Sequence, residues 1–256
     1  MVFPGRSIHA VFAGFAVFLA GYCGLGAGRA EDRAERPAAP SQVHYVLELF
    51  TSQGCSSCPR ADRWLAAIAR EPHVVALSFP VDYWDFIGWR DTLASPAFTA
   101  RQKAYAVQNH RHVYTPQVVV NGLTDAPGSD EKEIKEAMRM AEEAEGAMSV
   151  PLRLFTSDGH YFVEVAEGAG GPAGVFALRV VRAVTVQILR GENAGQSLTY
   201  TNVVRTIDKL GDWTGATKTF NVPGEPKIGE GFVVLLQKGT LERPGAILAA
   251  AKTEGL

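Results

Sequence analysis

The strongest constraint on the fold is a cysteine pair, Cys55 and Cys58, that lies between two segments of different periodicity. The residues before the pair (HYVLELFT) are typical of a short apolar strand, and the apolar residues after it recur at helical spacing. Pro59 lacks an amide hydrogen and fits a helix only in its first turn, so the helix must begin close to Ser56 or Ser57. The sequence therefore predicts two thiols at the start of a helix that directly follows a strand.

This position predicts a reactive thiol at Cys55. The N-terminal end of a helix carries partial positive charge and free backbone N–H groups, which together stabilise a thiolate. Such surroundings lower a thiol pKa from ~8.5 toward ~7 or below. We therefore expect Cys55 to be the attacking thiolate and Cys58, one turn further in and less exposed, to be the resolving thiol. The expected reaction is thiol–disulfide exchange.

Other interpretations of the cysteine pair stay open. One is an inert structural disulfide, although a loop this short contributes little chain-entropy stabilisation. Another is copper binding by the dithiol and a nearby histidine; four histidines are available, none at a diagnostic spacing: His44, His73, His110 and His112. A non-catalytic binding protein is the alternative from a different class of function. The prediction names no cofactor and no metal ligand.

The first 30 residues have the pattern of a secretory signal. A weakly basic start precedes an apolar segment from Ala10 to Ala20, and small residues lead to a cleavage site after Ala30. The apolar run is shorter than the ~20 residues that span a bilayer, so we expect an exported protein, periplasmic or secreted, without stable membrane insertion. An exported location lets a disulfide persist. Tyr22, a bulky residue directly before Cys23, argues against a lipid anchor there.

Charge excludes one class of partner. Cleavage after Ala30 removes two arginines and no acidic residue, which leaves 23 basic and 27 acidic residues. This balance offers no basic face for nucleic acid. Residues 31–42, rich in Glu, Arg, Ala and Pro, are expected to form a disordered leader. The remaining chain exceeds the usual size of a single domain, so two domains are predicted.

The two predicted domains differ in their patterns. Residues 43–146 predict the order strand, helix, strand, helix, strand, strand, helix, with an Asn121–Gly122 hairpin turn and helices capped by Ser95 and Ser129. Residues 148–256 predict an antiparallel β-sandwich, because short alternating runs are separated by Gly, Pro, Asp and Asn. These runs cover residues 150–155, 161–165, 175–188, 217–222, 232–237 and 246–251.

Two segments resemble known redox proteins. The run LFTSQGCSSCPRAD (49–62) resembles the active site of thioredoxin-fold proteins, and TPQVVVNG (115–122) resembles the glutaredoxin segment in which a cis-proline faces the C-x-x-C. The resemblance implies a thioredoxin-like, glutaredoxin-like α/β domain over 43–146. It also implies a cis bond before Pro116, with the backbone of Thr115 free to pair with a client strand. The expected partners are protein thiols or disulfides in the cell envelope, rather than glutathione.

The whole chain is identified as a member of an exported bacterial family, the domain-of-unknown-function family numbered 1223. Seven motifs carry this resemblance: GCSSCP (54–59), VDYWD (81–85), SPAFTARQ (95–102), VYTPQ (113–117), NGLTDAPGSD (121–130), RGENAG (190–195) and TNVVR (201–205). They are spread over both predicted domains. The resemblance supplies no function, because none is established for the family.

Four residues after the second predicted strand are candidates for a substrate groove: Asp82, Trp84, Asp85 and Trp89. Ligand crevices in open α/β sheets form at strand ends, and a tryptophan offers an amphipathic contact surface. The alternative is that both tryptophans only pack this segment against the core. Asp82 is also a candidate proton acceptor for Cys58.

A second group of polar residues belongs to the second predicted domain: Arg190, Glu192, Asn193, Asn202 and Arg205. We expect them to form salt bridges and turn contacts. A ligand site or a domain interface is the alternative.

Overall fold

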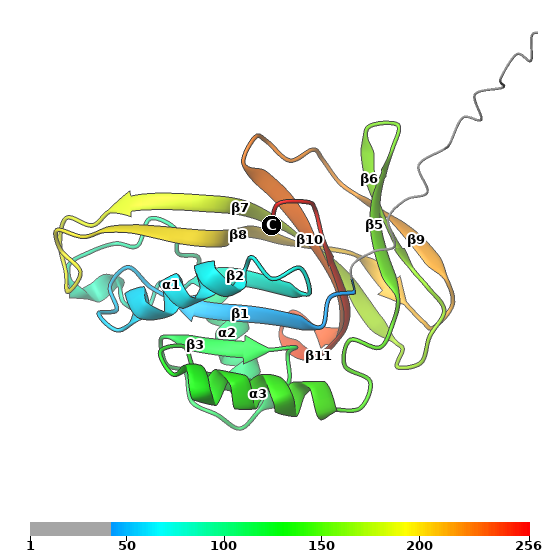
Figure 1. The fold of residues 1–256 in the computed structure, drawn as a ribbon, viewed down its shortest axis with the longest axis horizontal. Helices are drawn as coiled ribbons and strands as arrows, with labels where there is room; N and C mark the ends of the chain where they lie inside the picture. The colour runs from blue at the N-terminus through cyan, green and yellow to red at the C-terminus, as the bar shows by residue number, and fades with distance from the viewer. Residues whose placement is uncertain (1–41) are drawn as a thin grey trace, which may run out of the picture. The chain divides into compact units, whose positions relative to one another are not determined.

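Two parallel strands and the helix between them begin the fold. In the computed structural model, which describes residues 42–256, β1 (Tyr45–Thr51) pairs in parallel with β2 (Val74–Pro80), and α1 (Cys58–Ile68) connects them (Figure 1). Every residue of β2 is buried, as is every residue of β1 after the first, which is typical of strands covered on both faces. The predicted signal segment and the predicted leader up to residue 41 lie outside the described residues.

Strands β3 (Gln117–Val120) and β4 (Thr124–Pro127) extend the sheet on the other side of β1. Both pairings are antiparallel. The turn between β3 and β4 has positive φ at Asn121 (49°) and Gly122 (69°), as the predicted hairpin requires.

Helix α2 (Pro96–Gln108) begins at the predicted cap, and the hydroxyl of Ser95 accepts the Ala97 N–H. Helix α3 (Glu131–Glu143) is capped by Asp130, not by Ser129, since the Asp130 carboxylate accepts two backbone N–H groups of the first turn. The order of elements predicted for 43–146 is therefore present, with a short 3₁₀ helix, η1 (Asp85–Ile87), as an addition. Within the described residues, no helix combines the length and hydropathy needed to cross a bilayer.

The predicted fold class, a thioredoxin-like α/β domain followed by a separate β-sandwich, is wrong. Eight strands form one mixed sheet in the order β11-β10-β7-β8-β2-β1-β3-β4, so the strands of the second half continue the sheet of the first. Only three further strands form a second, small sheet in the order β5-β6-β9. The strands after α3 are β5 (Leu152–Ser157), β6 (His160–Val165), β7 (Ala173–Gln187), β8 (Ser197–Trp213), β9 (Lys218–Val222), β10 (Glu230–Thr240) and β11 (Arg243–Lys252).

Strand β8 is the element that sequence reasoning missed, and it is the one that joins the two halves. It runs parallel to β2, with Ser78 opposite Val203. Side chains reinforce this join: the Ser78 hydroxyl donates to the Thr201 carbonyl (2.7 Å), and the Asn202 amide donates to the Ala76 carbonyl (2.9 Å). Residues 40–256 accordingly form one compact unit, and the predicted boundary near residue 147 falls in the connection between α3 and β5.

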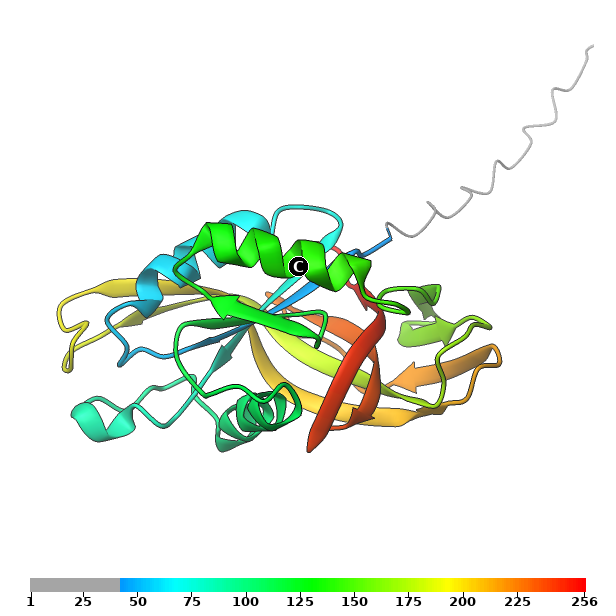
Figure 2. The ribbon, with the colours of Figure 1, turned by 90° about the horizontal axis from the view of Figure 1, so that it is seen from below.

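Apolar side chains from both halves share one core. On one face of the sheet, Phe50 and Phe79 pack in the same buried cluster as Leu178 of β7, Val204 of β8 and Leu235 of β10. Helix α2 covers this face, and α1 and α3 cover the opposite face of the β1-β2-β3 region (Figure 2). The small sheet packs against β7, β10 and β11 in a separate cluster around Trp213.

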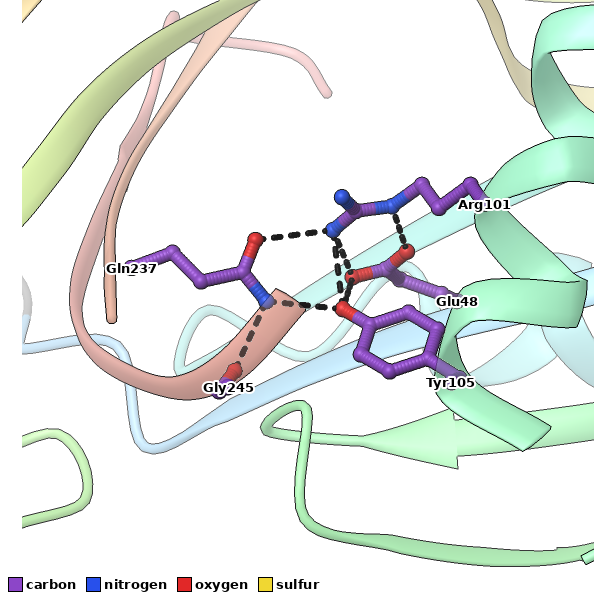
Figure 3. A network of polar contacts seen from close by, with 5 residues as sticks. All are labelled: Glu48, Arg101, Tyr105, Gln237 and Gly245. Atoms are coloured by element: carbon purple, nitrogen blue, oxygen red, sulfur yellow. Dashed lines mark hydrogen bonds and ion pairs between the residues drawn. The ribbon is translucent and has the colours of Figure 1, made fainter. Parts of the chain in front are cut away.

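A buried polar network ties the two halves together beneath α2 (Figure 3). Arg101 of α2 holds Glu48 of β1 with two parallel hydrogen bonds of 2.6 and 2.7 Å. The Arg101 guanidinium also donates to Tyr105 (2.8 Å) and to the side-chain oxygen of Gln237 on β10 (3.0 Å). The Gln237 amide donates in turn to the Gly245 carbonyl (2.8 Å). Such bidentate pairs are among the stronger polar contacts, and the network around this pair links α2, β1 and β10.

Candidate functional site

The two cysteines lie where a tight turn leads from β1 into α1. The Ser52 hydroxyl accepts the Gly54 N–H (3.1 Å), and the Ser52 carbonyl accepts the Cys55 N–H (3.2 Å). Helix α1 begins at Cys58 after its cap residue Ser57, and a proline occupies the first turn as predicted. Gly54 is required for close approach, because a Cβ there would lie only 3.0 Å from the Cβ of Trp84.

Cys55 and Cys58 are joined by a disulfide, with 5.4 Å between their Cα atoms. The Cys55 sulfur also lies 3.4 Å from the hydroxyl oxygen of Ser57. The exposure of the pair differs from expectation: Cys55 is 1% exposed and Cys58 is 0% exposed. Both sulfurs are therefore shielded from solvent in the oxidised state.

The loop between β7 and β8 packs on the cysteine turn. The Asn193 amide, itself buried, donates to the carbonyls of Gln53 and Cys55, both at 2.9 Å. The Glu192 carboxylate accepts the Ser56 N–H (3.3 Å). We call residues 188–196, between β7 and β8, the covering loop. In Figures 1 and 2 this end of the β7–β8 hairpin lies on the same side of the molecule as the turn that precedes α1.

The five polar residues predicted as a group in the second half therefore lie in different places. Glu192 and Asn193 contact the cysteine turn, and Asn202 lies at the join between β2 and β8. Arg190 and Arg205 form no ion pair with any described residue.

The four predicted groove residues surround the cysteine turn unequally. The indole N–H of Trp89 donates to the Gln53 side chain (2.8 Å). Trp84 packs against Gly54, and its indole N–H donates to the Thr115 hydroxyl (2.8 Å). Both tryptophans are half-buried, so they hold the turn in place as well as bordering it.

The two aspartates of that group form hydrogen bonds within their own region instead. Asp82 accepts a hydrogen bond from Thr99 of α2 (2.5 Å), and Asp85 accepts the Asp91 N–H (2.9 Å). Asp91 is buried and accepts the Gln53 N–H (2.8 Å) and two further backbone N–H groups. The hydrogen bond to Thr99 turns Asp82 toward α2, which leaves the predicted role of proton acceptor for Cys58 without geometric support.

The predicted cis bond between Thr115 and Pro116 is confirmed. Pro116 is buried and packs near α1: a Cβ added to Gly128 would meet the Cβ atoms of both Pro116 (3.0 Å) and Ala61 (3.1 Å). Neither the N–H nor the carbonyl of Thr115 bonds another residue in the described chain. Thr115 is therefore free to pair with an extended segment from outside.

Sequence reasoning missed a buried carboxyl group next to the cysteines. Asp62 lies one helical turn after Cys58 on the buried face of α1, and residues at this spacing have Cβ atoms about 5–6 Å apart. Asp62 is 4% exposed, and neither of its oxygens has a hydrogen-bond partner among the described residues. The signal was available, because the apolar spacing of α1 places an acidic residue on its inner face.

Burial raises the pKa of Asp62 from 3.8 to about 7, and the negative charge of Asp91 adds to the rise. The Thr51 hydroxyl, which faces Asp62 without forming a hydrogen bond of good geometry to it, and the charge of Arg63 offset part of the rise. Tyr200 of β8 faces the same region; burial first, and then the charges of Asp62 and Asp91, raise its pKa. A carboxyl group one helical turn from the resolving cysteine can thus hold or release a proton near neutral pH.

Two of the four histidines considered as copper ligands, His44 and His73, lie away from the cysteines. His44 and His73 contact each other with ring centroids 5.7 Å apart, at the start of β1, whereas the cysteine turn follows its end. Seven strand residues separate the two places by roughly 20 Å. Within residues 42–256, no three His, Cys, Asp or Glu side chains are grouped to hold a metal ion.

One comparison with known proteins identifies a family, and another finds a similar solved structure. Residues 46–237 match the model of DUF1223, described as a protein of unknown function. A solved structure, the X-ray crystal structure of protein AGR_C_4864 from Agrobacterium tumefaciens, is 32% identical. The match covers 85% of this chain and 97% of that one, with a TM-score of 0.73. No curated protein matches the chain.

Proposed function

We propose that this chain, which belongs to the DUF1223 family of proteins of unknown function, carries out thiol–disulfide exchange on proteins of the cell envelope. One observation carries the proposal. A disulfide at the start of α1 lies one helical turn from a buried, unpartnered carboxyl group whose pKa is raised to about 7. An inert disulfide needs no such group, and burying a carboxyl without a partner costs stability.

The exchange has two steps. A client thiolate attacks the Cys55 sulfur, which forms a mixed disulfide and breaks the bond to Cys58; the Cys58 thiolate then takes a proton from Asp62. A second client thiolate attacks the client sulfur of the mixed disulfide, which forms the client disulfide and releases Cys55 as a thiolate. The client loses two electrons and the protein gains them. The same steps in reverse reduce a client disulfide, and the reduction potential of the pair sets the direction.

The surroundings of the disulfide assign roles to other residues. The start of α1 stabilises the Cys55 thiolate once it is released. The free backbone groups of Thr115 hold an extended client segment beside the cysteine turn. Because both cysteines are buried and Asn193 bonds the Cys55 carbonyl, the covering loop must open before a client reaches Cys55. Action in the cell envelope rests on the signal-like first 30 residues and on the need for a compartment that permits disulfides.

Trapping tests the proposal. In Cys58→Ser, the resolving thiol is absent, so mixed disulfides between Cys55 and clients should accumulate and should disappear on reduction. Cys55→Ser is the matched control and should trap none. Purified wild type should also exchange with a model disulfide peptide. If Cys58→Ser accumulates no adducts and the reduced protein shows no exchange, the enzyme interpretation fails and a non-catalytic binding protein is favoured.

A further inference from the structure

A large cavity lies between α2 and the second half of the molecule. Its volume is about 760 Å³, which falls within the range of small-molecule sites. One wall is α2, and the other is formed by residues 205–207 of β8 and 241–243 at the β10–β11 turn. None of its lining residues belongs to the cysteine site.

Helix α2 presents an apolar stripe to this cavity. Ala97, Ala100, Ala104 and Val107 recur at spacings of three and four residues, which places them on one face of the helix. Val107 is 77% exposed, although the opposite face of α2 is packed in the core. Ile207 and Leu241 line the facing wall, so an apolar chain placed between them would contact apolar surface on both sides.

Cationic side chains surround the apolar walls. Lys103, Arg205 and Arg243 line the cavity, and none of them forms an ion pair within residues 42–256. Glu242 is the acidic side chain that lines the cavity with them, so the positive charges outnumber the negative.

Arg101 supplies a second, independent indication of an anion. Its side chain is 4% exposed and lines the cavity. The Nε and Nη2 atoms donate to Glu48, Tyr105 and Gln237, but Nη1 donates to no described residue. Figure 3 shows Nη1 outside the network of dashed lines. A rigidly held guanidinium with two free N–H donors suits a carboxylate oxygen.

We propose that this cavity binds an amphipathic carboxylate, an acid with a single aliphatic chain. The chain lies along the apolar stripe of α2, and the carboxylate accepts hydrogen bonds from Arg101 Nη1 and is attracted by Arg205 and Arg243. The site is independent of the cysteine chemistry, so its success or failure leaves the proposed function untouched.

Calorimetric titration of the full chain with decanoate tests this proposal, with 1-decanol as the uncharged probe of equal chain length. We expect binding of one decanoate per chain and at least tenfold weaker binding of decanol. Ala104→Trp should abolish binding by filling the cavity. The double variant Arg205→Glu, Arg243→Glu should weaken decanoate binding at least tenfold, and Lys132→Glu on α3 is the matched control that leaves it unchanged.

A second blocking variant distinguishes loss of binding from misfolding. Ala100→Glu places a carboxylate on an exposed position of the stripe and should also abolish decanoate binding, with the circular dichroism spectrum of the wild type. Three results would overturn the proposal: no binding, equal binding of decanol, or binding that persists in both blocking variants. Sedimentation that shows a dimer dissociated by these variants would overturn it too, since the cavity would then be an interface between two copies.

Discussion

Two buried polar sites occupy opposite faces of the same sheet, and they differ in how completely their hydrogen-bonding capacity is used. Beneath α2, Glu48 is held by Arg101 with good geometry, and Tyr105 and Gln237 complete the network. Beneath α1, Asp62 has no partner in the described chain. A satisfied network of this kind supports the fold, whereas an unsatisfied carboxyl beside a disulfide is kept at a cost to stability and points to chemistry.

The largest effect should come from breaking the satisfied site. Arg101→Met leaves Glu48 buried without a counter-charge and removes two further hydrogen bonds. We expect the free energy of unfolding to fall by about 5 kcal/mol, as for other buried pairs that lose one partner. Urea unfolding measures it. Arg139→Met, which breaks only exposed ion pairs on α3, should leave the free energy of unfolding nearly unchanged. Equal losses in the two variants would refute the contrast.

Removing the unsatisfied carboxyl group should stabilise the protein rather than destabilise it, and by an amount that depends on pH. The pKa of Asp62 is about 7 in the folded chain against 3.8 for the free side chain, so the folded state binds the proton more tightly. This group therefore lowers the stability of the wild type as pH rises from about 4 to about 7, by at most ~4 kcal/mol. Asp62→Asn lacks this loss, so its stability relative to wild type should rise across that window.

Unfolding of oxidised wild type and Asp62→Asn at a series of pH values measures the difference. Asp158→Asn, in an exposed turn, is the control and should track the wild type. The titratable groups that face Asp62 stay in place in every variant: Asp91, Tyr200 and Arg63. A difference that does not vary with pH would show that Asp62 is ionised in the folded protein at acid pH.

Another variant tests whether the face of the sheet that holds the unsatisfied Asp62 is also the face that opens to clients. Asn193→Ala removes two hydrogen bonds from the covering loop to the cysteine turn, each worth about 1 kcal/mol. We expect dithiothreitol to reduce the disulfide roughly tenfold faster in this variant, because the open state is more populated. Asn221→Ala, an exposed amide on β9, should react like the wild type. An unchanged rate in Asn193→Ala would mean that the loop is no barrier.

The smallest expected effect is a shift in the pH at which Cys55 reacts, and its cause is electrostatic. The Glu192 carboxylate accepts the Ser56 N–H at the start of α1, so its negative charge opposes a Cys55 thiolate. Glu192→Gln should move the pH midpoint of Cys55 alkylation in the reduced protein down by ~0.3, and 1 M salt should reduce this shift. The remote and exposed Glu225→Gln should leave the midpoint in place. A midpoint that rises in Glu192→Gln contradicts the assignment.

The parts of the fold that were predictable depend on local pattern. The cap at Ser95, the Asn121–Gly122 turn and the start of α1 near Pro59 each follow from residues within one turn of one another. The fold class was not predictable in this way, since it depends on β8. The alternation of apolar and polar residues in this strand breaks at the adjacent Val203 and Val204, and its pairing with β2 joins residues 78 and 203, which no local pattern can indicate.

The candidate site, too, could be predicted from the sequence only in part. The cysteines, Thr115 and Pro116 were found from their own motifs, and Trp84 and Trp89 do contact the cysteine turn. The burial of Cys55 could not be foreseen, because the residues that cover it lie 138 positions downstream. Asp62 was visible in the sequence, but its lack of a partner depends on what β8 brings next to it.

The distance along the chain between the disulfide and its cover has a consequence for biosynthesis. Asn193 bonds Cys55 across 138 residues, so a polypeptide that emerges from its N-terminus exposes both thiols long before residues 188–196 exist to shield them. The nascent chain thus passes through a stage in which oxidants and foreign cysteines have open access to the pair. Shielding of this site must therefore wait until about three quarters of the chain has been made.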